Sequence, residues 1–215
     1  VTHRPAANNL FGGDGNDKIF AGKADVGNDT MKGGAGADTI GGGAGADSLD
    51  GGAGNDLIFG GKGDVNSSGT NDVISGGDGN DKIYASGGND KVEGGRGNDT
   101  LFGGGGTDSI DGGAGNDIIW GGAGNDILTG GTGSDTFSFK SGNGDDKVKD
   151  FKVGEDKLAL QQTATDFKSI GDVQAAAKTA QVDGASGVMI DTGAGDSIFL
   201  EGLTVNDLTN LDYLF

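Results

Sequence analysis

The stretch GGAGNDLIFGGKGD, from Gly51 to Asp64, places one short apolar cluster between two groups of turn residues. Glycine loses more conformational entropy on folding than any other residue, so such a stretch is a poor basis for an ordinary core. The whole chain has the same character, with 49 glycines among 215 residues, 33% hydrophobic residues and a formal net charge of −18. This composition alone predicts disorder, so a folded state needs stabilisation from outside the chain.

The quoted stretch belongs to an array of repeated units over residues 12–138. Most units are nine residues long, and we number their positions 1 to 9. Two units are longer because each carries a similar insertion, GKADV in one and GKGDV in the other. The thirteen units begin at Gly12, Ala21, Gly33, Gly42, Gly51, Gly60, Gly76, Ala85, Gly94, Gly103, Gly112, Gly121 and Gly130.

Two residue types recur in every unit, which composition bias does not explain. The aspartate that closes the turn, position 6 of a regular unit, is Asp17, Asp29, Asp38, Asp47, Asp56, Asp72, Asp81, Asp90, Asp99, Asp108, Asp117, Asp126 and Asp135. The apolar residue two places later, position 8, is Ile19, Met31, Ile40, Leu49, Ile58, Ile74, Ile83, Val92, Leu101, Ile110, Ile119, Leu128 and Phe137. The array is therefore a structural repeat.

Each unit reads as a turn followed by a very short strand. The GGxGxD portion supplies glycines for positive φ and Asn or Asp residues that tolerate it. The last three residues place the middle side chain on one face and its neighbours on the other. Two units then complete one coil with both apolar rows inside. The sequence predicts an all-β fold, a right-handed parallel β-roll of about six and a half coils, with a mostly-β C-terminal cap carrying one or two short helices.

Stacking the aspartates would bring like charges together in neighbouring coils. A hard dication that accepts carboxylate and backbone carbonyl oxygens would relieve this repulsion. Calcium fits better than Mg²⁺, which needs tight octahedral geometry, or Zn²⁺, which prefers nitrogen and sulfur. The alternative is that the aspartates are ordinary solvated turn residues.

Units such as GGAGNDLIF, GGRGNDTLF and GGAGNDIIW resemble the nonapeptide of the repeats-in-toxin (RTX) family, a calcium-binding parallel β-helix repeat. The resemblance implies that a unit shares calcium with the next but one, which gives eleven aspartate pairs such as Asp99 with Asp117. We expect roughly seven to nine calcium ions, since the insertions, Thr70 and the Ala85–Ser86 start weaken some turns. Besides the thirteen aspartates, the predicted ligands are the carbonyl-bearing turn glycines Gly34, Gly36, Gly43, Gly45, Gly52, Gly54, Gly77, Gly79, Gly95, Gly97, Gly104, Gly106, Gly113, Gly115, Gly122 and Gly124. Asp25 and Asp64, in the insertions, are interpreted as loop bulges, with extra ligands or a contact surface as the alternative.

The repeat pattern ends after Asp135. Residues 137–160 predict strands that cap the roll, and residues 169–181 predict a helix capped by Ser169 with Asp172. Residues 187–191 and 197–201 predict a hairpin, and Thr204 with Asp207 predicts a last short helix. Asp145 and Asp146 are candidates for a final calcium ligand.

This tail is similar to the C-terminal region of serralysin-type secreted metalloproteases at residues 135–139 and 150–160. Its acidic and then apolar ending, residues 212–215, resembles the ending that such proteins present to a type I secretion apparatus. The resemblance implies an uncleaved export signal within the last 50 or so residues. We therefore divide the chain into a linker or upstream remnant (1–11), an RTX calcium-binding roll (12–138) and a capping and secretion-signal region (139–215).

Several classes of function are disfavoured. The acidity argues against nucleic acid, and no apolar run reaches the length of a membrane span. The chain has no cysteine and one histidine, His3, and lacks an HExxH or other catalytic motif, so we expect no enzyme activity. Since the sequence starts at Val1 with no leader, we expect further sequence upstream.

The leading hypothesis is a calcium-dependent folding and secretion module of a larger bacterial protein, which is exported by a type I apparatus and folds outside the cell on binding calcium. The alternative is an extracellular adhesion, surface-layer or polysaccharide-binding module, with a cell-surface polysaccharide or another protein as partner. Its outward candidates are Lys18, Lys82, Arg96, Phe59, Tyr84, Phe102 and Trp120, which are otherwise ordinary outer-face residues.

Overall fold

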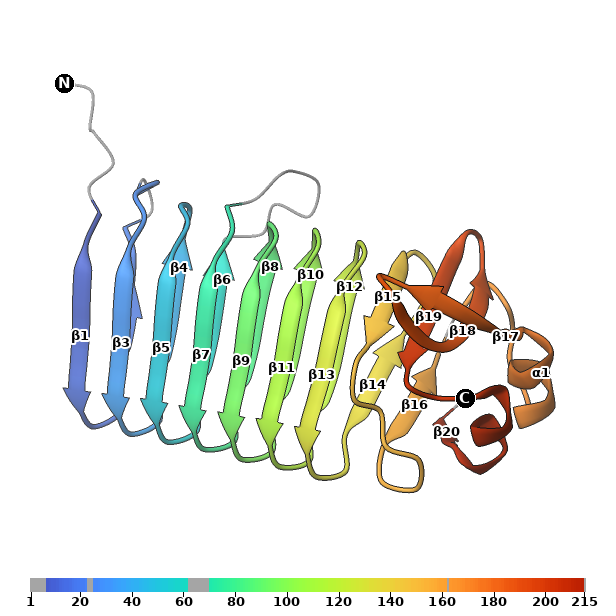
Figure 1. Cartoon of the computed structure of the whole chain (residues 1–215). Coiled ribbons are helices and arrows are strands. Elements are labelled where there is room, and N and C mark those ends of the chain that lie inside the picture. The colour runs from blue at the N-terminus through green and yellow to red at the C-terminus, as the bar shows by residue number, and fades with distance from the viewer. Residues whose placement is uncertain (1–6, 23–24, 62–69, 162, 215) are drawn as a thin grey trace.

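The computed structural model describes residues 7–22, 25–61, 70–161 and 163–214. The chain enters two sheets alternately, so that strands adjacent in a sheet are two elements apart in sequence (Figure 1). One sheet has eleven strands and the other nine. From residue 9 to residue 160 all pairings are parallel, which confirms the predicted all-β parallel roll with two repeat units per coil.

The strands have the following bounds, in their order across each sheet. The eleven-stranded sheet contains β1 (Asn9–Asp14), β3 (Thr30–Ala35), β5 (Ser48–Ala53), β7 (Val73–Asp78), β9 (Lys91–Arg96), β11 (Ser109–Ala114), β13 (Ile127–Thr132), β15 (Asp145–Val148), β19 (Asp196–Glu201), β18 (Ala185–Gly193) and β17 (Ala177–Val182). The nine-stranded sheet contains β2 (Lys18–Phe20), β4 (Thr39–Gly43), β6 (Leu57–Gly61), β8 (Lys82–Gly87), β10 (Thr100–Gly105), β12 (Ile118–Ala123), β14 (Thr136–Phe139), β16 (Lys157–Leu160) and β20 (Asp212–Leu214).

The core consists of one side chain per unit. All thirteen position-8 residues are buried, and they stack in register along the roll, as Ile83, Leu101 and Ile119 do on neighbouring strands. Their neighbours at positions 7 and 9 point outward, as a two-residue period requires. The sequence therefore predicted the core correctly, and Phe137, Leu158 and Leu160 extend it into the C-terminal part.

The strands are longer than predicted. We expected strands of three residues, whereas β5 contains Ser48 to Ala53 and most other strands of the array have five or six residues. The extra residues are positions 1 to 3 of the following unit, so the first two glycines lie in the sheet and only three residues turn the corner at a regular turn. Glycine commonly marks a turn, but the glycines at positions 1 and 2 of these units lie within strands. Since the position-1 glycine has no side chain, the strand can pass close to the carboxylate of the aspartate in its unit.

The C-terminal part continues both sheets before it closes them. β15 and β16 pair in parallel with β13 and β14, so no break in the sheets occurs at residue 138. The predicted hairpin is β18 with β19, which pair antiparallel. The last strand, β20, pairs with β16, and therefore residues 212–214 of the predicted export ending form part of the nine-stranded sheet.

The predicted helix over residues 169–181 is only partly correct. Helix α1 is Ile170–Ala175, with Ser169 at its N-cap as expected, but residues 177–182 form β17 against β18. The edge of β18 offers those residues a full ladder of backbone hydrogen bonds, which outweighs the weak helix preference of a short alanine run. The 3₁₀ helix η1 (Val205–Asn210) follows Thr204, whose N–H donates to Asp207 at 2.7 Å, as the capping prediction requires. Among the described residues no helix is long and apolar enough to cross a membrane.

A core truncation tests the inward row. Leu101→Ala should lower the free energy of unfolding by about 2–5 kcal/mol, because Leu101 is completely buried between two coils. The matched control, Ser109→Ala on the exposed face of β11, should change it by less than about 0.5 kcal/mol. Urea unfolding in calcium measures both, and equal effects would contradict the assignment of the inner face.

Candidate metal centre

The position-6 aspartates lie in the turns and form two rows along the two edges of the roll. The turns that lead from the eleven-stranded to the nine-stranded sheet carry the first row, and the return turns carry the second. From Asp29 onward each repeat aspartate is at most 2% exposed. The first row is Asp17, Asp38, Asp56, Asp81, Asp99, Asp117 and Asp135, and the second is Asp29, Asp47, Asp72, Asp90, Asp108 and Asp126.

One carboxylate oxygen of each aspartate fixes the register between coils. The backbone N–H of Asp81 donates to Oδ1 of Asp99 at 2.7 Å, and that of Asp99 donates to Oδ1 of Asp117 at 2.8 Å. The same bond joins all eleven predicted pairs, at 2.7 to 2.9 Å. The structure thus brings together every pair that the family resemblance implied.

The other carboxylate oxygen has no partner in the protein. Oδ2 of all thirteen repeat aspartates is buried and accepts no hydrogen bond. An ionised carboxylate buried with an unpaired oxygen is strongly unfavourable unless the group is protonated or a cation is bound. The same unpaired carboxylate oxygen recurs in every unit, and this observation on the protein itself indicates metal binding.

Position 1 of the unit shows where further oxygen atoms meet these carboxylates. A Cβ atom built on Gly33 would overlap both Oδ2 of Asp38 and the carbonyl oxygen of Gly51. Equivalent overlaps occur at Gly94 and Gly112, so a carboxylate and a carbonyl oxygen converge beside each of these glycines. Our sequence reasoning named glycines at positions 2 and 4 and missed position 1. The signal was present, since only Ala21 and Ala85 interrupt glycine at this position.

The predicted glycines at positions 2 and 4 all have positive φ. Gly95 and Gly97 show why no other residue suits them: a Cβ on either would collide with the carbonyl oxygen of the equivalent glycine in the preceding coil, Gly77 or Gly79. Their carbonyl oxygens are thereby stacked in rows along the same edges as the aspartates. Whether they act as ligands stays a prediction.

Burial makes these aspartates unusual acids in the absence of metal. Desolvation raises the pKa of Asp72, Asp99 and Asp108 to about 7; the backbone hydrogen bond at each carboxylate opposes the shift, and neighbouring aspartates of the same row add to it. The same causes raise the pKa of Asp146 to about 8. In the metal-free roll, a substantial fraction of these groups is protonated at neutral pH.

Each row ends in a residue outside the array, and the two ends differ. Asp146 continues the second row, since its Oδ1 accepts from the N–H of Asp126 at 3.0 Å and its Oδ2 has no partner. Asp145, the other candidate, points outward and accepts a hydrogen bond from Ser197 at 2.6 Å. Asp156 ends the first row with both oxygens satisfied, by the N–H groups of Asp135 and Lys152. The first row therefore ends at a carboxylate that is fully hydrogen-bonded by the protein backbone.

Asparagine side chains, which the sequence analysis did not single out, form a further series of hydrogen bonds beside the aspartates. Oδ1 of Asn80 accepts from the N–H of Asn98 at 2.7 Å, and Oδ1 of Asn98 accepts from Asn116 at 2.7 Å. These asparagines precede the aspartates, at position 5, and their frequency in the sequence was the available signal. They satisfy exposed backbone donors of the turns without adding charge.

The insertions contribute no third carboxylate to these rows among the described residues. The carboxylate of Asp25 accepts from the side chain of Asn8 at 2.6 Å and from the N–H of Gly27 at 3.1 Å, as expected for a bulge held by its own contacts. Asp64 and His3 lie outside the described residues. Within the described ranges, no group of three or more His, Cys, Asp or Glu side chains could hold a metal ion, so backbone carbonyls would complete any centre. An all-oxygen donor set of this kind suits calcium.

Comparison with known proteins agrees with this chemistry. A family model described as the RTX calcium-binding nonapeptide repeat matches residues 5–40, 23–49, 33–64, 67–101 and 102–137, which together span more than half of the chain. No curated protein sequence matches.

Two solved structures are similar in part. The extracellular lipase LipA from Serratia marcescens aligns with 92% of this chain at 20% identity and a TM-score of 0.36, and the chain spans 40% of its length. The AlgE6R3 subunit of the Azotobacter vinelandii mannuronan C5-epimerase aligns with 62% of this chain and 81% of its own, at 26% identity and a TM-score of 0.44.

The raised pKa values predict an inverted pH dependence for the metal-free chain. Unfolded carboxyl groups titrate near pH 4, whereas burial raises the pKa of Asp81, Asp99 and Asp146 to about 6, 7 and 8, so folding favours their protonated form. This contribution to stability is fully present below about pH 4 and is lost as the pH rises to about 8. Circular dichroism in chelator should therefore show β-structure increasing from pH 8 to pH 4.5. A loss of β-structure on acidification would contradict the buried, unpaired state of these carboxyls.

Proposed function

The chain belongs to the family of the RTX calcium-binding nonapeptide repeat, and we propose that it is a folding and secretion module whose two aspartate rows bind calcium only outside the cell. Members of this family bind calcium and are secreted. The observation that carries the proposal is the series of buried aspartate Oδ2 atoms that have no hydrogen-bond partner. Above the pKa values of these groups, a chain with this many unpaired buried carboxylates is a stable folded protein only when a cation is present.

We assign the calcium ligands to pairs of aspartates two units apart, with turn carbonyls completing each shell. Oδ2 of each aspartate supplies charge, and the carbonyl oxygens of the position-1 glycines join those of positions 2 and 4 as neutral donors. When bound, the dication neutralises two stacked carboxylates and links consecutive coils. Roughly seven to nine ions would fill the two rows.

Calcium binding and folding would then be a single event. At low calcium the carboxylates repel and the glycine-rich chain has little apolar surface to bury, so the unfolded chain is favoured. Modules of this kind meet extracellular calcium near their affinities of about 10⁻⁴–10⁻³ M. Binding to the folded state alone shifts the equilibrium by mass action, so the chain folds as it emerges.

The C-terminal region fits export before folding. In the folded chain β20 is paired with β16, and Tyr213 is half-buried. A type I apparatus that reads this ending would therefore have to do so while the chain is unfolded. We assign residues 12–138 to the calcium-binding roll and residues 139–215 to the cap with the export signal, although the sheets themselves continue across this boundary.

The roll is a structural calcium-binding element, and we propose that any catalytic activity of the full protein resides outside it. The outward residues considered for surface binding do not form one set. Arg96 belongs to the eleven-stranded sheet and pairs with Asp78, whereas the aromatic residues and Lys82 lie on the nine-stranded sheet.

Calcium titration is the primary test of the function. Far-UV circular dichroism of the chain should change cooperatively from coil to β-structure as calcium replaces chelator at neutral pH, because the ions neutralise both rows. Magnesium at the same concentration should have little effect, since it demands octahedral geometry and keeps its waters. A chain that is fully folded in chelator at pH 7.5 would refute calcium-dependent folding.

A matched pair of double variants tests the assigned ligands. Asp99→Asn with Asp117→Asn keeps the Oδ1 hydrogen bonds of the first row but removes two charged ligands, so the calcium midpoint should rise several-fold. The control, Glu93→Gln with Asp111→Asn, removes two charges from the outer faces of β9 and β11 in the same coils. The control should leave the midpoint unchanged or lower it slightly, and equal increases in both variants would contradict shared calcium sites.

A further inference from the structure

The departures from the nonapeptide pattern gather at one corner of the roll. On the first edge every turn of the array contains three residues, without insertion. Both insertions lie on the second edge, after β2 and after β6, with the turn after β4 between them. The other exceptions lie in β4 and β8 or directly after β2: Ala21 and Ala85 at position 1, Ser86 at position 2 and Gly41 at position 9. Local breaks in an otherwise consistent pattern are expected at functional sites.

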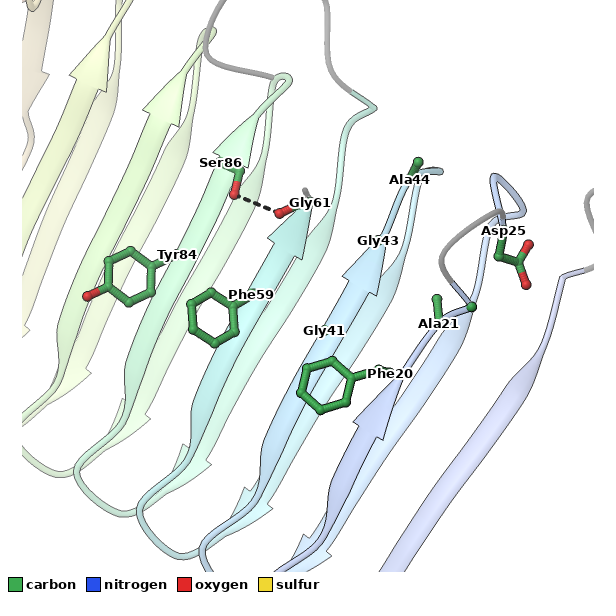
Figure 2. Close-up of a pocket in the computed structure, with 11 residues that line it drawn as sticks. Phe20, Ala21, Asp25, Gly41, Gly43, Ala44, Phe59, Gly61, Tyr84 and Ser86 are labelled. Atoms are coloured by element: carbon green, nitrogen blue, oxygen red, sulfur yellow. Dashed lines mark hydrogen bonds between the residues drawn. The ribbon is translucent and has the colours of Figure 1, made fainter. Parts of the chain in front are cut away.

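This corner encloses a cavity of about 660 Å³ on the outer face of the nine-stranded sheet. Its lining includes Phe20, Gly41, Gly43, Phe59, Tyr84 and Ser86. Figure 2 shows the three aromatic rings in a row, with the glycine-bearing ends of β4 and β6 beside them. The volume lies within the range of small-ligand sites and would hold one or two six-membered rings.

A missing side chain creates the hollow. At position 9 of this sheet, Phe59, Tyr84, Phe102 and Trp120 form an aromatic stack with ring centres 5.4, 4.7 and 4.6 Å apart. The next residue in register beyond Phe59 is Gly41, and the residue beyond that is Phe20, which is 55% exposed. The aromatic stack therefore ends at Phe59, because the ring of Phe20 lies over Gly41. The hollow lies beside these rings, where Gly43 and Gly61 have no side chain.

The negative charge of the strands is placed away from this face. None of the strands from β2 to β16 in the nine-stranded sheet contains Asp or Glu, whereas the eleven-stranded sheet exposes Asp50, Glu93 and Asp111. β4 and β6 contain no charged residue at all. Asp25 borders the cavity, but its carboxylate is occupied by Asn8 and Gly27. The uncharged polar side chains of the lining are Tyr84 and Ser86, and the Ser86 hydroxyl donates to the carbonyl of Gly61 at 3.1 Å. Lys82 lies next to the cavity, with its Nζ 5.3 Å from the centre of the Tyr84 ring.

We infer that this cavity binds a neutral sugar ring of a polysaccharide, a function beyond calcium-dependent folding. A pyranose has an apolar C–H face that packs on aromatic rings and a rim of hydroxyl groups that hydrogen-bond to a serine hydroxyl and backbone carbonyls. The carboxylate of Asp25, which borders the cavity, would repel a carboxylated sugar, and the hydroxyl groups of Ser86 and Tyr84 favour a ligand with polar groups over a fully apolar chain. Neutral rings satisfy both the aromatic and the polar parts of the lining.

The test uses the full chain in saturating calcium. Isothermal titration calorimetry with neutral hexasaccharides of glucose, mannose and xylose, and with a uronic acid hexasaccharide, should detect binding of at least one neutral series and none of the uronate. Gly41→Phe should weaken that binding at least about tenfold, because the new ring displaces the ring of Phe20, which lines the cavity. The backbone of Gly41 does not need positive φ, and its Cβ would overlap only the ring of Phe20, which is 55% exposed and has room to move, so the roll should still fold.

Gly105→Phe is the matched control. It adds the same side chain to β10 of the same sheet, where a Cβ meets no atom within 4 Å, and it should leave sugar binding within about twofold of the original. Phe59→Leu supplies a second disrupting variant should Gly41→Phe alter the calcium midpoint. The inference is overturned if no neutral sugar binds at millimolar concentration, if the uronate binds as well as the neutral series, or if Gly41→Phe binds normally. It is also overturned if sedimentation shows a dimer that Gly41→Phe dissociates, since the cavity then accommodates a second copy of the chain.

Discussion

The structure depends on the unequal use of the two oxygens of each buried aspartate. Oδ1 accepts the backbone N–H of the aspartate two units earlier, and this charge-assisted bond aligns every coil with the next. Oδ2 has no partner, so the same residue that fixes the register also makes the fold costly without a cation. Register and metal requirement therefore cannot be separated by changing the residue to an apolar one. The need for a cation therefore comes from the same carboxylates that align the coils.

The glycine content follows from this arrangement. Position-1 glycines leave room for a carboxylate and a carbonyl oxygen, and glycines at positions 2 and 4 avoid the carbonyl oxygens of the preceding coil. Each unit then has space for one inward apolar side chain, which stacks on its equivalents and fills the narrow interior. The entropy lost by ordering so much glycine must be offset by interactions between coils, because little apolar surface is available. Hydrogen bonds along both sheets, the two aspartate rows and bound calcium are the interactions that remain.

Features that depend on the period of the sequence were predictable, and features that depend on contacts between distant residues were not. The period predicted two units per coil and the inward position-8 residues, and the family resemblance implied the pairing of aspartates such as Asp99 and Asp117. Strand length was underestimated because glycine in a strand and glycine in a turn look alike in sequence. The end of helix α1 was misplaced because residues 177–182 pair with β18, a partner that local sequence does not reveal. The closure of the first row by Asp156 depends equally on where Lys152 lies in the fold.

The separation between inner and outer faces explains how the roll tolerates irregular units. Asp47 and Asp72 are separated by an insertion, yet the N–H of Asp47 still donates to Oδ1 of Asp72 at 2.8 Å, as in uninterrupted coils. The inner positions of the unit must therefore obey the repeat, while residues outside the turn are free to change. Both insertions lie on one edge, next to the end of the aromatic stack at Phe59. If the inner positions provide the proposed calcium-dependent stability, the outer face of the nine-stranded sheet is where a specific interaction can be added without disturbing it.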